Sequence, residues 1–145
     1  MANLTGRERS QYVRQMFGRI APRYDLLNRL MTGGQDARCR RAAVDALELQ
    51  PGGCILDVGA GTGDIAFEAL KRIVDGRVVA TDLTYEMMVL GRRKPGGDSV
   101  DWVLADALHL PFAESVFQGV ISGYLLRNVP DVPAALVEQQ RVLTP

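Results

Sequence analysis

Apolar residues near the beginning of the chain recur at helical spacing. They do so from Glu8 to Ile20, whereas residues 1–7 show no such pattern and are expected to be frayed. Pro22 ends this predicted helix, because the residue before a proline is disfavoured in helical backbone. A second, shorter helix is predicted by the apolar residues Leu26, Leu27, Leu30 and Met31. Two small helices joined by a proline predict either a lid over a binding site or a flap packed on a sheet.

Beyond residue 35, short apolar runs alternate with helical patterns. Such alternation is typical of the α/β class, in which helices cover both faces of a doubly wound parallel sheet. The predicted strands are 54–58, 77–82, 100–105 and 117–126. The predicted helices are 36–47, with Asp36 as its N-cap, 64–72, 85–93 and 133–143. We therefore expect a helical segment over residues 1–35 and an α/β domain over residues 36–145.

The first predicted strand leads directly into three glycines at alternate positions. Residues 55–64 read I-L-D-V-G-A-G-T-G-D. Glycine is needed where the backbone turns tightly and a ligand approaches it, so this strand, turn and helix predict a nucleotide-binding corner. Dinucleotide folds use the different spacing G-x-G-x-x-G, which disfavours a nicotinamide-dependent oxidoreductase. A tight turn that binds no ligand is the alternative.

Carboxylates at this corner favour a cationic ligand. Asp57 and Asp64 place two negative charges where a dinucleotide fold would bind its pyrophosphate. Among nucleotide-like cofactors, S-adenosylmethionine carries a sulfonium and an ammonium, and it therefore fits this corner better. The sequence thus predicts a site for S-adenosylmethionine.

The first three predicted strands each end in a carboxylate. These are Asp57, Asp82 and Asp106. Because such folds bind ligands at the carboxyl ends of their strands, we expect the three side chains at one ligand-binding edge. Asp82 follows the glycine corner by about 20 residues, which is the place of the acid that binds ribose hydroxyls. The alternative is that Asp82 caps the helix near Tyr85, a role that Thr84 can also fill and so leave Asp82 free for the ligand.

The remaining contacts to an adenosine group are expected just after the second and third strands. Asp106 is placed to accept a hydrogen bond from the adenine amino group, and the backbone N–H of Ala107 to serve a ring nitrogen. Met87 is either core filler or a soft contact for the adenine face. The single histidine, His109, is expected to be a solvated loop residue rather than an acid–base catalyst.

The charge of the chain is balanced overall and uneven along its length. The 145 residues carry 17 basic and 17 acidic side chains, but residues 1–41 carry nine arginines against three acids, a net charge of +6. This predicts either a solvated basic surface or a patch that faces an anionic partner or membrane headgroups. Overall neutrality argues against nucleic acid as the main ligand.

Hydropathy and cysteine usage indicate a cytoplasmic protein. No apolar run approaches ~20 residues, so no transmembrane helix or signal peptide is expected. The two cysteines, Cys39 and Cys54, lack a metal-binding spacing, and we expect no metal site.

Several segments resemble those of class I S-adenosylmethionine-dependent methyltransferases. The glycine corner by itself indicates only this superfamily and no particular family within it. R-Y-D-L-L-N (residues 23–28) and L-R-N-V-P-D (126–131) narrow the resemblance to the ubiquinone/menaquinone biosynthesis C-methyltransferase family. D-L-T-Y-E-M-M (82–88), A-D-A-L-H-L-P-F (105–112) and R-V-L-T-P (141–145) extend it, from about Val13 to the last residue. The chain departs from the family at Asp36 and Cys39, where family members usually have His and Trp.

The resemblance implies a fold, a reaction and a set of site residues. The fold is a Rossmann-like doubly wound sheet of the class I methyltransferase type, of which the chain holds the N-terminal half with about four parallel strands. The reaction is methylation of a ring carbon of a polyprenyl quinol, either demethylmenaquinol or a ubiquinone precursor. The cofactor residues implied are Asp57, Gly59, Gly61, Thr62, Gly63, Asp82, Leu83, Met87, Asp106 and Ala107. The substrate residues implied are Tyr24, Asp25, Asn28, Arg127 and Asn128, and no general base is indicated.

Other functions and partners follow from the same residues. The cofactor residues fit equally an S-adenosylmethionine-binding fragment without turnover and a methyltransferase for a soluble small molecule. A lipophilic quinol substrate and basic N-terminal helices predict peripheral contact with the inner membrane face. Members of the family continue beyond R-V-L-x-P, so the fourth strand is expected to be a bare edge, which favours a homodimer.

Overall fold

The computed structural model describes residues 6–32 and 35–145. Residues 1–5 of the stretch expected to be frayed lie outside the described part, whereas Gly6 already belongs to a helix. The first three helical elements are α1 (Gly6–Ile20), the 3₁₀ turn η1 (Ala21–Arg23) and α2 (Tyr24–Thr32). Together they form the N-terminal segment, residues 6–32. Within the described part of the chain, no helix is long and apolar enough to cross a bilayer.

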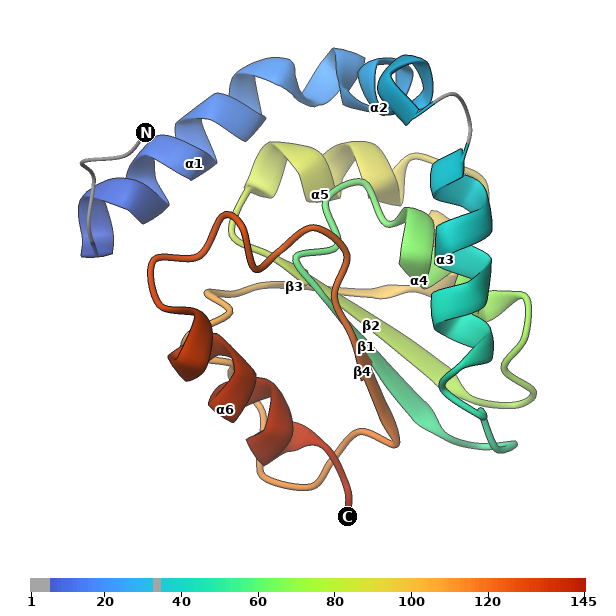
Figure 1. Cartoon of the computed structure of the whole chain (residues 1–145). Coiled ribbons are helices and arrows are strands. Elements are labelled where there is room, and N and C mark those ends of the chain that lie inside the picture. The colour runs from blue at the N-terminus through green and yellow to red at the C-terminus, as the bar shows by residue number, and fades with distance from the viewer. Residues whose placement is uncertain (1–5, 33–34) are drawn as a thin grey trace.

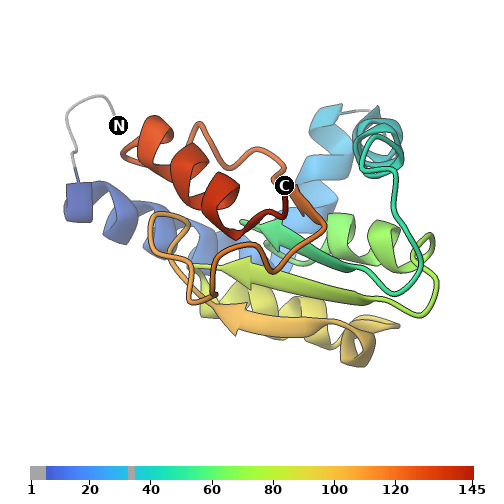
Figure 2. The same cartoon turned by 90° about the horizontal axis from the view of Figure 1, so that it is seen from below.

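The centre of the fold is a four-stranded parallel sheet in the order β3-β2-β1-β4. The strands are β1 (Cys54–Val58), β2 (Arg77–Asp82), β3 (Asp101–Leu104) and β4 (Gly119–Ile121). Figure 2 shows them side by side, with β3 at one edge. The chain winds outward from β1 to β3 and then returns to the other side of β1. The strand order therefore reverses between β1 and β4, the place where α/β sheets bind ligands.

Strand alternation produces one apolar cluster on each face of the sheet. Leu56, Val58 and Val79 face the cluster that includes Ala135 and Val142 of α6 (Val132–Val142). The neighbouring strand residues face the opposite cluster, where they meet α3 (Gln35–Asp45) and α4 (Asp64–Leu70): Ile55, Val78 and Ala80. Because successive strand residues point to opposite faces, short continuous apolar runs build both layers at once.

The N-terminal segment lies over the carboxyl ends of the strands. Figure 1 shows α1 and α2 passing above α5 (Tyr85–Arg92), with α3 descending beside the sheet. Phe17 and Tyr24 pack edge to face within this segment, with ring centroids 5.7 Å apart. The segment therefore faces the edge of the sheet at which the glycine corner and the strand-end carboxylates emerge.

Three element boundaries differ from those expected. The fourth strand is limited to 119–121, because Phe117 pairs instead with Leu143 in an isolated bridge and Tyr124 has a φ of +59°, which is incompatible with a strand. The third strand loses one residue at each end and covers 101–104. The prediction that Asp36 is an N-cap is wrong, since α3 already includes Gln35. The same helix ends at residue 45, two residues earlier than expected.

Other boundaries agree more closely with expectation. The strands predicted over 54–58 and 77–82 are observed with those limits. Helix α6 begins one residue earlier than expected, because Asp131 accepts a hydrogen bond from the backbone N–H of Ala134 and caps it.

Candidate functional site

The loop after β1 uses glycine where two other segments approach it closely. Gly61 has a φ of +58°, and a Cβ at this position would lie 3.3 Å from Cε of Met87. Gly63 has a φ of +83° and caps α4, and its Cβ would lie 2.5 Å from Cη2 of Trp102. Left-handed backbone and close approach both select glycine. The corner is thereby packed tightly between β3 and α5.

Asp82, the last residue of β2, is bonded to the glycine corner. Its Oδ2 accepts the backbone N–H of Gly61 at 2.8 Å, and its Oδ1 accepts the backbone N–H of Thr84 at 2.7 Å. Burial raises the pKa of this carboxyl, while the two backbone donors act in the opposite direction. A carboxylate offers about four lone-pair sites, which is more than these two backbone bonds occupy.

Thr84 does not cap α5 with its side chain. It stands at the N-cap position of this helix without a side-chain capping hydrogen bond. The alternative in which Asp82 caps α5 is therefore wrong, since Thr84 occupies the N-cap position and its backbone N–H donates to Asp82.

Asp57 lies beneath the corner rather than in front of it. Only 1% of the residue is exposed, and its Oδ2 accepts the backbone N–H of Ala66 at 3.0 Å. Its Oδ1 has no hydrogen-bond partner among the described residues. Burial raises the pKa of Asp57 to about 7, with the negative charges of Asp82 and Asp64 acting in the same direction. The structure thus gives Asp57 the role of holding the first turn of α4.

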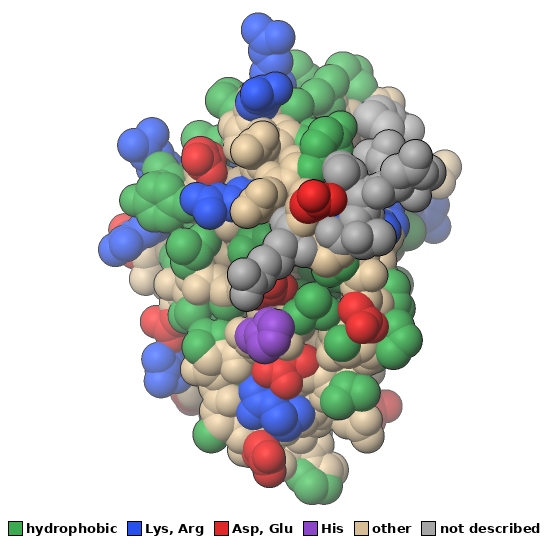
Figure 3. Space-filling model, turned by 90° about the vertical axis from the view of Figure 1, so that its left-hand side faces the viewer, with side chains coloured by type: hydrophobic (Ala, Val, Ile, Leu, Met, Phe, Trp, Pro, Cys, Tyr) green, Lys and Arg blue, Asp and Glu red, His purple; other side chains and the backbone are tan. Residues whose placement is uncertain are grey.

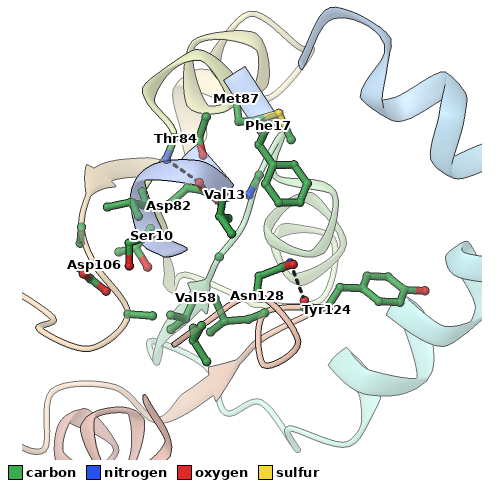
Figure 4. A pocket seen from close by; sticks show the side chains of 18 of the residues that line it. Ser10, Val13, Phe17, Val58, Asp82, Thr84, Met87, Asp106, Tyr124 and Asn128 are labelled. Atoms are coloured by element: carbon green, nitrogen blue, oxygen red, sulfur yellow. Dashed lines mark hydrogen bonds between the residues drawn. The ribbon is translucent and has the colours of Figure 1, made fainter. Parts of the chain in front are cut away.

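A first cavity lies between α1 and the carboxyl ends of the strands. Its volume is about 90 Å³. Figure 4 shows Ser10, Val13 and Phe17 of α1 around it together with Asp82 and Asp106. Met87 lines it from α5. The two aspartates are its charged residues, and no lysine or arginine of the described chain lines it.

A second cavity lies between α2, α3 and the glycine corner. Its volume is about 350 Å³, and its polar lining includes Asn28, Asp36, Arg40 and Ser122. Both cavities are lined by the same five residues where they adjoin: Tyr24, Gly59, Gly61, Gly123 and Tyr124. The glycine corner therefore has a cavity on either side of it.

Charged side chains form a continuous ladder from α2 to α3. Lys94 Nζ lies 2.7 Å from Oδ2 of Asp25 and 2.9 Å from Oδ1 of Asp64. Arg40 continues the ladder, with one terminal nitrogen 2.7 Å from Asp64 and the other 2.8 Å from Asp36. Acidic and basic groups alternate along the whole series, so each cation is held by two carboxylates.

The expected site residues fall into three groups. Those that line the first cavity are Tyr24, Gly59, Gly61, Asp82, Leu83, Met87, Asp106, Ala107 and Asn128. Asn28 and Thr62 line the second cavity, as do three members of the first group: Tyr24, Gly59 and Gly61. Those that line neither cavity are Asp25, Asp57, Gly63 and Arg127. Most of the expected cofactor residues thus gather around one small space.

Two expected substrate residues have other partners. The Thr62 hydroxyl donates to Oδ1 of Asp25 at 2.6 Å, so Asp25 is bonded to the corner. The Arg127 guanidinium stacks on the Tyr124 ring, 5.0 Å from its centroid. His109 is exposed at the surface, as expected of a solvated loop residue (Figure 3).

Sequence reasoning missed the cavity residues supplied by α1. Ser10, Val13 and Phe17 lie on the helix face directed at the first cavity. Their spacing was visible as helical periodicity, but periodicity alone does not distinguish a face that packs on a core from one that covers a ligand site. Arg40 was also missed, because nothing in the local sequence separates it from the neighbouring arginines.

Comparison with known proteins decides the family. A sequence model of the ubiE/COQ5 methyltransferase family matches residues 5–145. The chain belongs to this family. A demethylmenaquinone methyltransferase from Symbiobacterium thermophilum is 39% identical over 95% of this chain and 57% of that protein. The ubiquinone/menaquinone biosynthesis C-methyltransferase UbiE from Desulfotalea psychrophila is 42% identical over 92% of this chain and 54% of that protein.

The chain spans about half the length of the curated ubiE/COQ5 relatives that it matches. Among solved structures, an S-adenosylmethionine-dependent methyltransferase from Aquifex aeolicus superposes with a TM-score of 0.65 and 22% identity, over 73% of this chain and 58% of that one. A likeness at this identity concerns the fold alone. The expected Rossmann-like sheet with four parallel strands is confirmed, as is the resemblance to the quinone C-methyltransferases.

Proposed function

We propose that this chain carries the cofactor-binding part of an S-adenosylmethionine-dependent C-methyltransferase. Its acceptor is a demethylated polyprenyl quinol, either demethylmenaquinol or a ubiquinone precursor. Family membership supports the reaction class, and the names of the relatives support the acceptor. The observation that carries the cofactor is the first cavity, where Asp82 and Asp106 face no basic side chain. Such a cavity attracts a sulfonium and repels a pyrophosphate.

The residues present fit this cofactor. Asp82 retains lone pairs for ribose hydroxyls, and Asp106 lies in the same cavity for the adenine amino group. Gly61 leaves room beside Met87 that a Cβ would reduce. When bound, S-adenosylmethionine supplies an electrophilic methyl group on a cationic sulfur. The protein's part is to bind and orient the two reactants and to exclude water.

The acceptor ring is assigned to the second cavity, which meets the first at the glycine corner. Its volume of about 350 Å³ is within the usual range for ligand pockets, about 300–1,000 Å³. Tyr24 and Asn28 line it from α2. An ionised quinol oxygen makes the adjacent ring carbon nucleophilic, so alignment accounts for most of the catalysis and no covalent enzyme intermediate is needed. Residues 1–35 then serve as the substrate segment and residues 36–145 as the cofactor domain.

Binding without turnover is the second candidate function. It is favoured by one observation, that the chain covers only 57% and 54% of two named methyltransferases. Both candidates require the same cofactor site, so cofactor binding is tested first and methyl transfer second.

Calorimetric titration of the 145-residue chain with S-adenosylmethionine and S-adenosylhomocysteine tests the cofactor site. We expect binding by the unaltered chain and at least tenfold weaker binding by Asp82→Ala. Asp98→Ala is the matched control, because Asp98 is an exposed carboxylate on the 3₁₀ turn before β3. A folded chain that binds neither compound would reject the proposal. Methyl transfer to a demethylmenaquinol analogue would then separate an enzyme from a binding fragment.

Contact with a membrane surface is part of the same proposal. Leu26 and Leu30 of α2 are 61% and 71% exposed, and exposed arginines lie on the elements before them. An apolar face beside basic side chains suits an anionic bilayer surface, and on this basis we propose a cytoplasmic location at the inner membrane face. Leu26→Ser/Leu30→Ser should reduce co-sedimentation with anionic vesicles, whereas Leu136→Ser/Val137→Ser on α6 should not. Sedimentation independent of anionic lipid would contradict this contact.

The last part of the proposed function is self-association of the chain through β4. β4 is the edge of the sheet within the described residues, and Leu136 and Val137 of α6 are exposed. An unpaired edge next to apolar side chains favours pairing with a second copy. Sedimentation velocity over a wide concentration range should reveal a dimer, and Val137→Glu should weaken it. A monomer at every concentration would reject the homodimer.

A further inference from the structure

We propose that Lys94 is a positioning residue that holds the N-terminal segment closed over the first cavity through its ion pair with Asp25. Opening of this pair then accompanies entry and release of the cofactor. The inference rests on the proposed cofactor and adds to it a residue outside the family motifs quoted above.

The N-terminal segment covers the cavity in which the cofactor is proposed to bind. Ser10, Val13 and Phe17 of α1 line the cavity (Figure 4), and Tyr24 of α2 lines it as well. This cavity is partly open to solvent and its volume is about 90 Å³, whereas ligand pockets usually hold about 300–1,000 Å³. The cofactor therefore requires displacement of the N-terminal segment, because the opposite wall is formed by the sheet and the glycine corner.

Asp25 connects this segment to the body of the fold. Its Oδ2 lies 2.7 Å from Lys94 Nζ, and its Oδ1 accepts the Thr62 hydroxyl at 2.6 Å. Both carboxylate oxygens thus contact residues that do not belong to the segment. Asp25 directly follows Tyr24, which lines both cavities, so this contact holds the segment next to a residue that borders both spaces.

The ion pair is built so that it can open without leaving a buried charge. Lys94 Nζ also lies 2.9 Å from Asp64 and donates to the Thr62 hydroxyl at 2.9 Å. When Asp25 moves away, Lys94 keeps these two partners, and Arg40 continues to hold Asp64. The Asp25 side chain is 45% exposed and is hydrated on release. Separation therefore replaces the ion pair of Asp25 with contacts to water, at a small cost in free energy, and it is reversible.

Amide hydrogen exchange of the free chain tests the contact without any cofactor. Asp25→Asn and Lys94→Gln should each accelerate exchange several-fold in residues 6–32 and leave exchange in β1 and β2 unchanged. Asp98→Asn, which alters an exposed carboxylate outside the contact, should leave both regions unchanged. Unaltered exchange in residues 6–32 of the two variants would overturn the proposal. Faster exchange throughout the chain would also overturn it, because that result indicates general destabilisation.

Stopped-flow binding of S-adenosylhomocysteine tests the link to the cofactor. Asp25→Asn should raise both the association and the dissociation rate constants several-fold, and added salt should raise them in the unaltered chain more than in the variant. Rate constants equal to those of the unaltered chain would overturn the proposal. Absence of binding by the unaltered chain would instead reject the proposed cofactor, and the exchange experiment would still decide whether Lys94 holds the segment.

Discussion

The backbone N–H of Gly61 donates a hydrogen bond to Oδ2 of Asp82 at 2.8 Å. This bond joins the glycine corner to the end of the neighbouring strand, so the carboxylate that faces the first cavity also fixes the loop that borders it. The other oxygen of Asp82 holds the Thr84 N–H at the start of α5. One side chain thereby positions two walls of the cavity.

Asp82→Asn should lower stability as well as cofactor affinity. The side-chain amide of asparagine has one oxygen, which can accept from only one of the two backbone N–H groups in the present geometry. Its NH₂ group then faces the second N–H, and two donors oppose each other. Hydrogen bonds to a charged group contribute roughly 1.5–3 kcal/mol, and we expect a loss of about this size in the free energy of unfolding. Urea denaturation measures it, with Asp98→Asn as the control. Unchanged stability would mean that the two bonds are not required to hold the loop.

Gly63→Ala should destabilise the chain more than Gly96→Ala. Both glycines have a φ of +83°, so the backbone strain is matched. A Cβ at residue 63 would lie 2.5 Å from Trp102, whereas at residue 96 its nearest neighbour is 4.0 Å away. We expect about 1 kcal/mol for residue 96 and a further 1–3 kcal/mol for residue 63. Equal losses in thermal or chemical denaturation would show that Trp102 adjusts without cost.

The buried carboxyl of Asp57 should make stability fall as pH rises. Its folded pKa is about 7, well above the ordinary value of 3.8, so the folded chain holds a proton that the unfolded chain releases between these values. The stabilisation is complete below the unfolded pKa and is lost as pH rises through 7. A shift of this size corresponds to ~4 kcal/mol at most.

Asp57→Asn carries no charge at any pH, so it removes this contribution. The variant should show a smaller decline in stability between pH 4 and pH 8. It should also be more stable than the unaltered chain at pH 8. Parallel pH profiles of the two proteins would contradict the assignment of the raised pKa to this residue.

Arg141→Met should cost more stability than Arg77→Met. Arg141 donates to the backbone oxygens of Leu110 and Phe112 and pairs with Glu138, so it ties α6 to the connection between β3 and β4. Arg77 pairs with Asp101 at the surface, where its side chain is 74% exposed. We expect about 2–3 kcal/mol for Arg141 and under about 1 kcal/mol for Arg77 in urea denaturation. The reverse order would refute the role given to Arg141.

The sheet and the glycine corner were predictable because local sequence specifies them. Apolar runs at 54–58 and 77–82 have the length of buried strands, and the glycine spacing has few alternatives. Phe117 belongs to an apolar run as well, yet it pairs with Leu143 in an isolated bridge. Local sequence does not predict this pairing, because it depends on where α6 ends in the fold.

The orientation of Asp57 was less accessible to sequence reasoning. Three strands end in carboxylates, but Asp57 precedes the last residue of its strand and points to the face occupied by Ile55 and α4. Asp82 ends its strand and Asp106 lies beyond β3, so both reach the cavity. Similar sequence positions therefore give different environments, because a shift of one residue reverses the face of a strand. The contribution of α1 depends on where a distant helix docks, which its periodicity does not encode.

Residues that line both cavities limit how the binding preferences of this family member can change. Tyr24, Gly59 and Gly61 border both spaces, so one substitution alters two binding surfaces together. With the proposed assignment of the acceptor ring and the cofactor to these cavities, selection for a different acceptor cannot act on these residues without also affecting cofactor binding. Residues that line only the second cavity, such as Asp36, Cys39 and Arg40, are free of that double constraint. We therefore expect acceptor preference to change through substitutions in α3, while the residues that line both cavities stay the same.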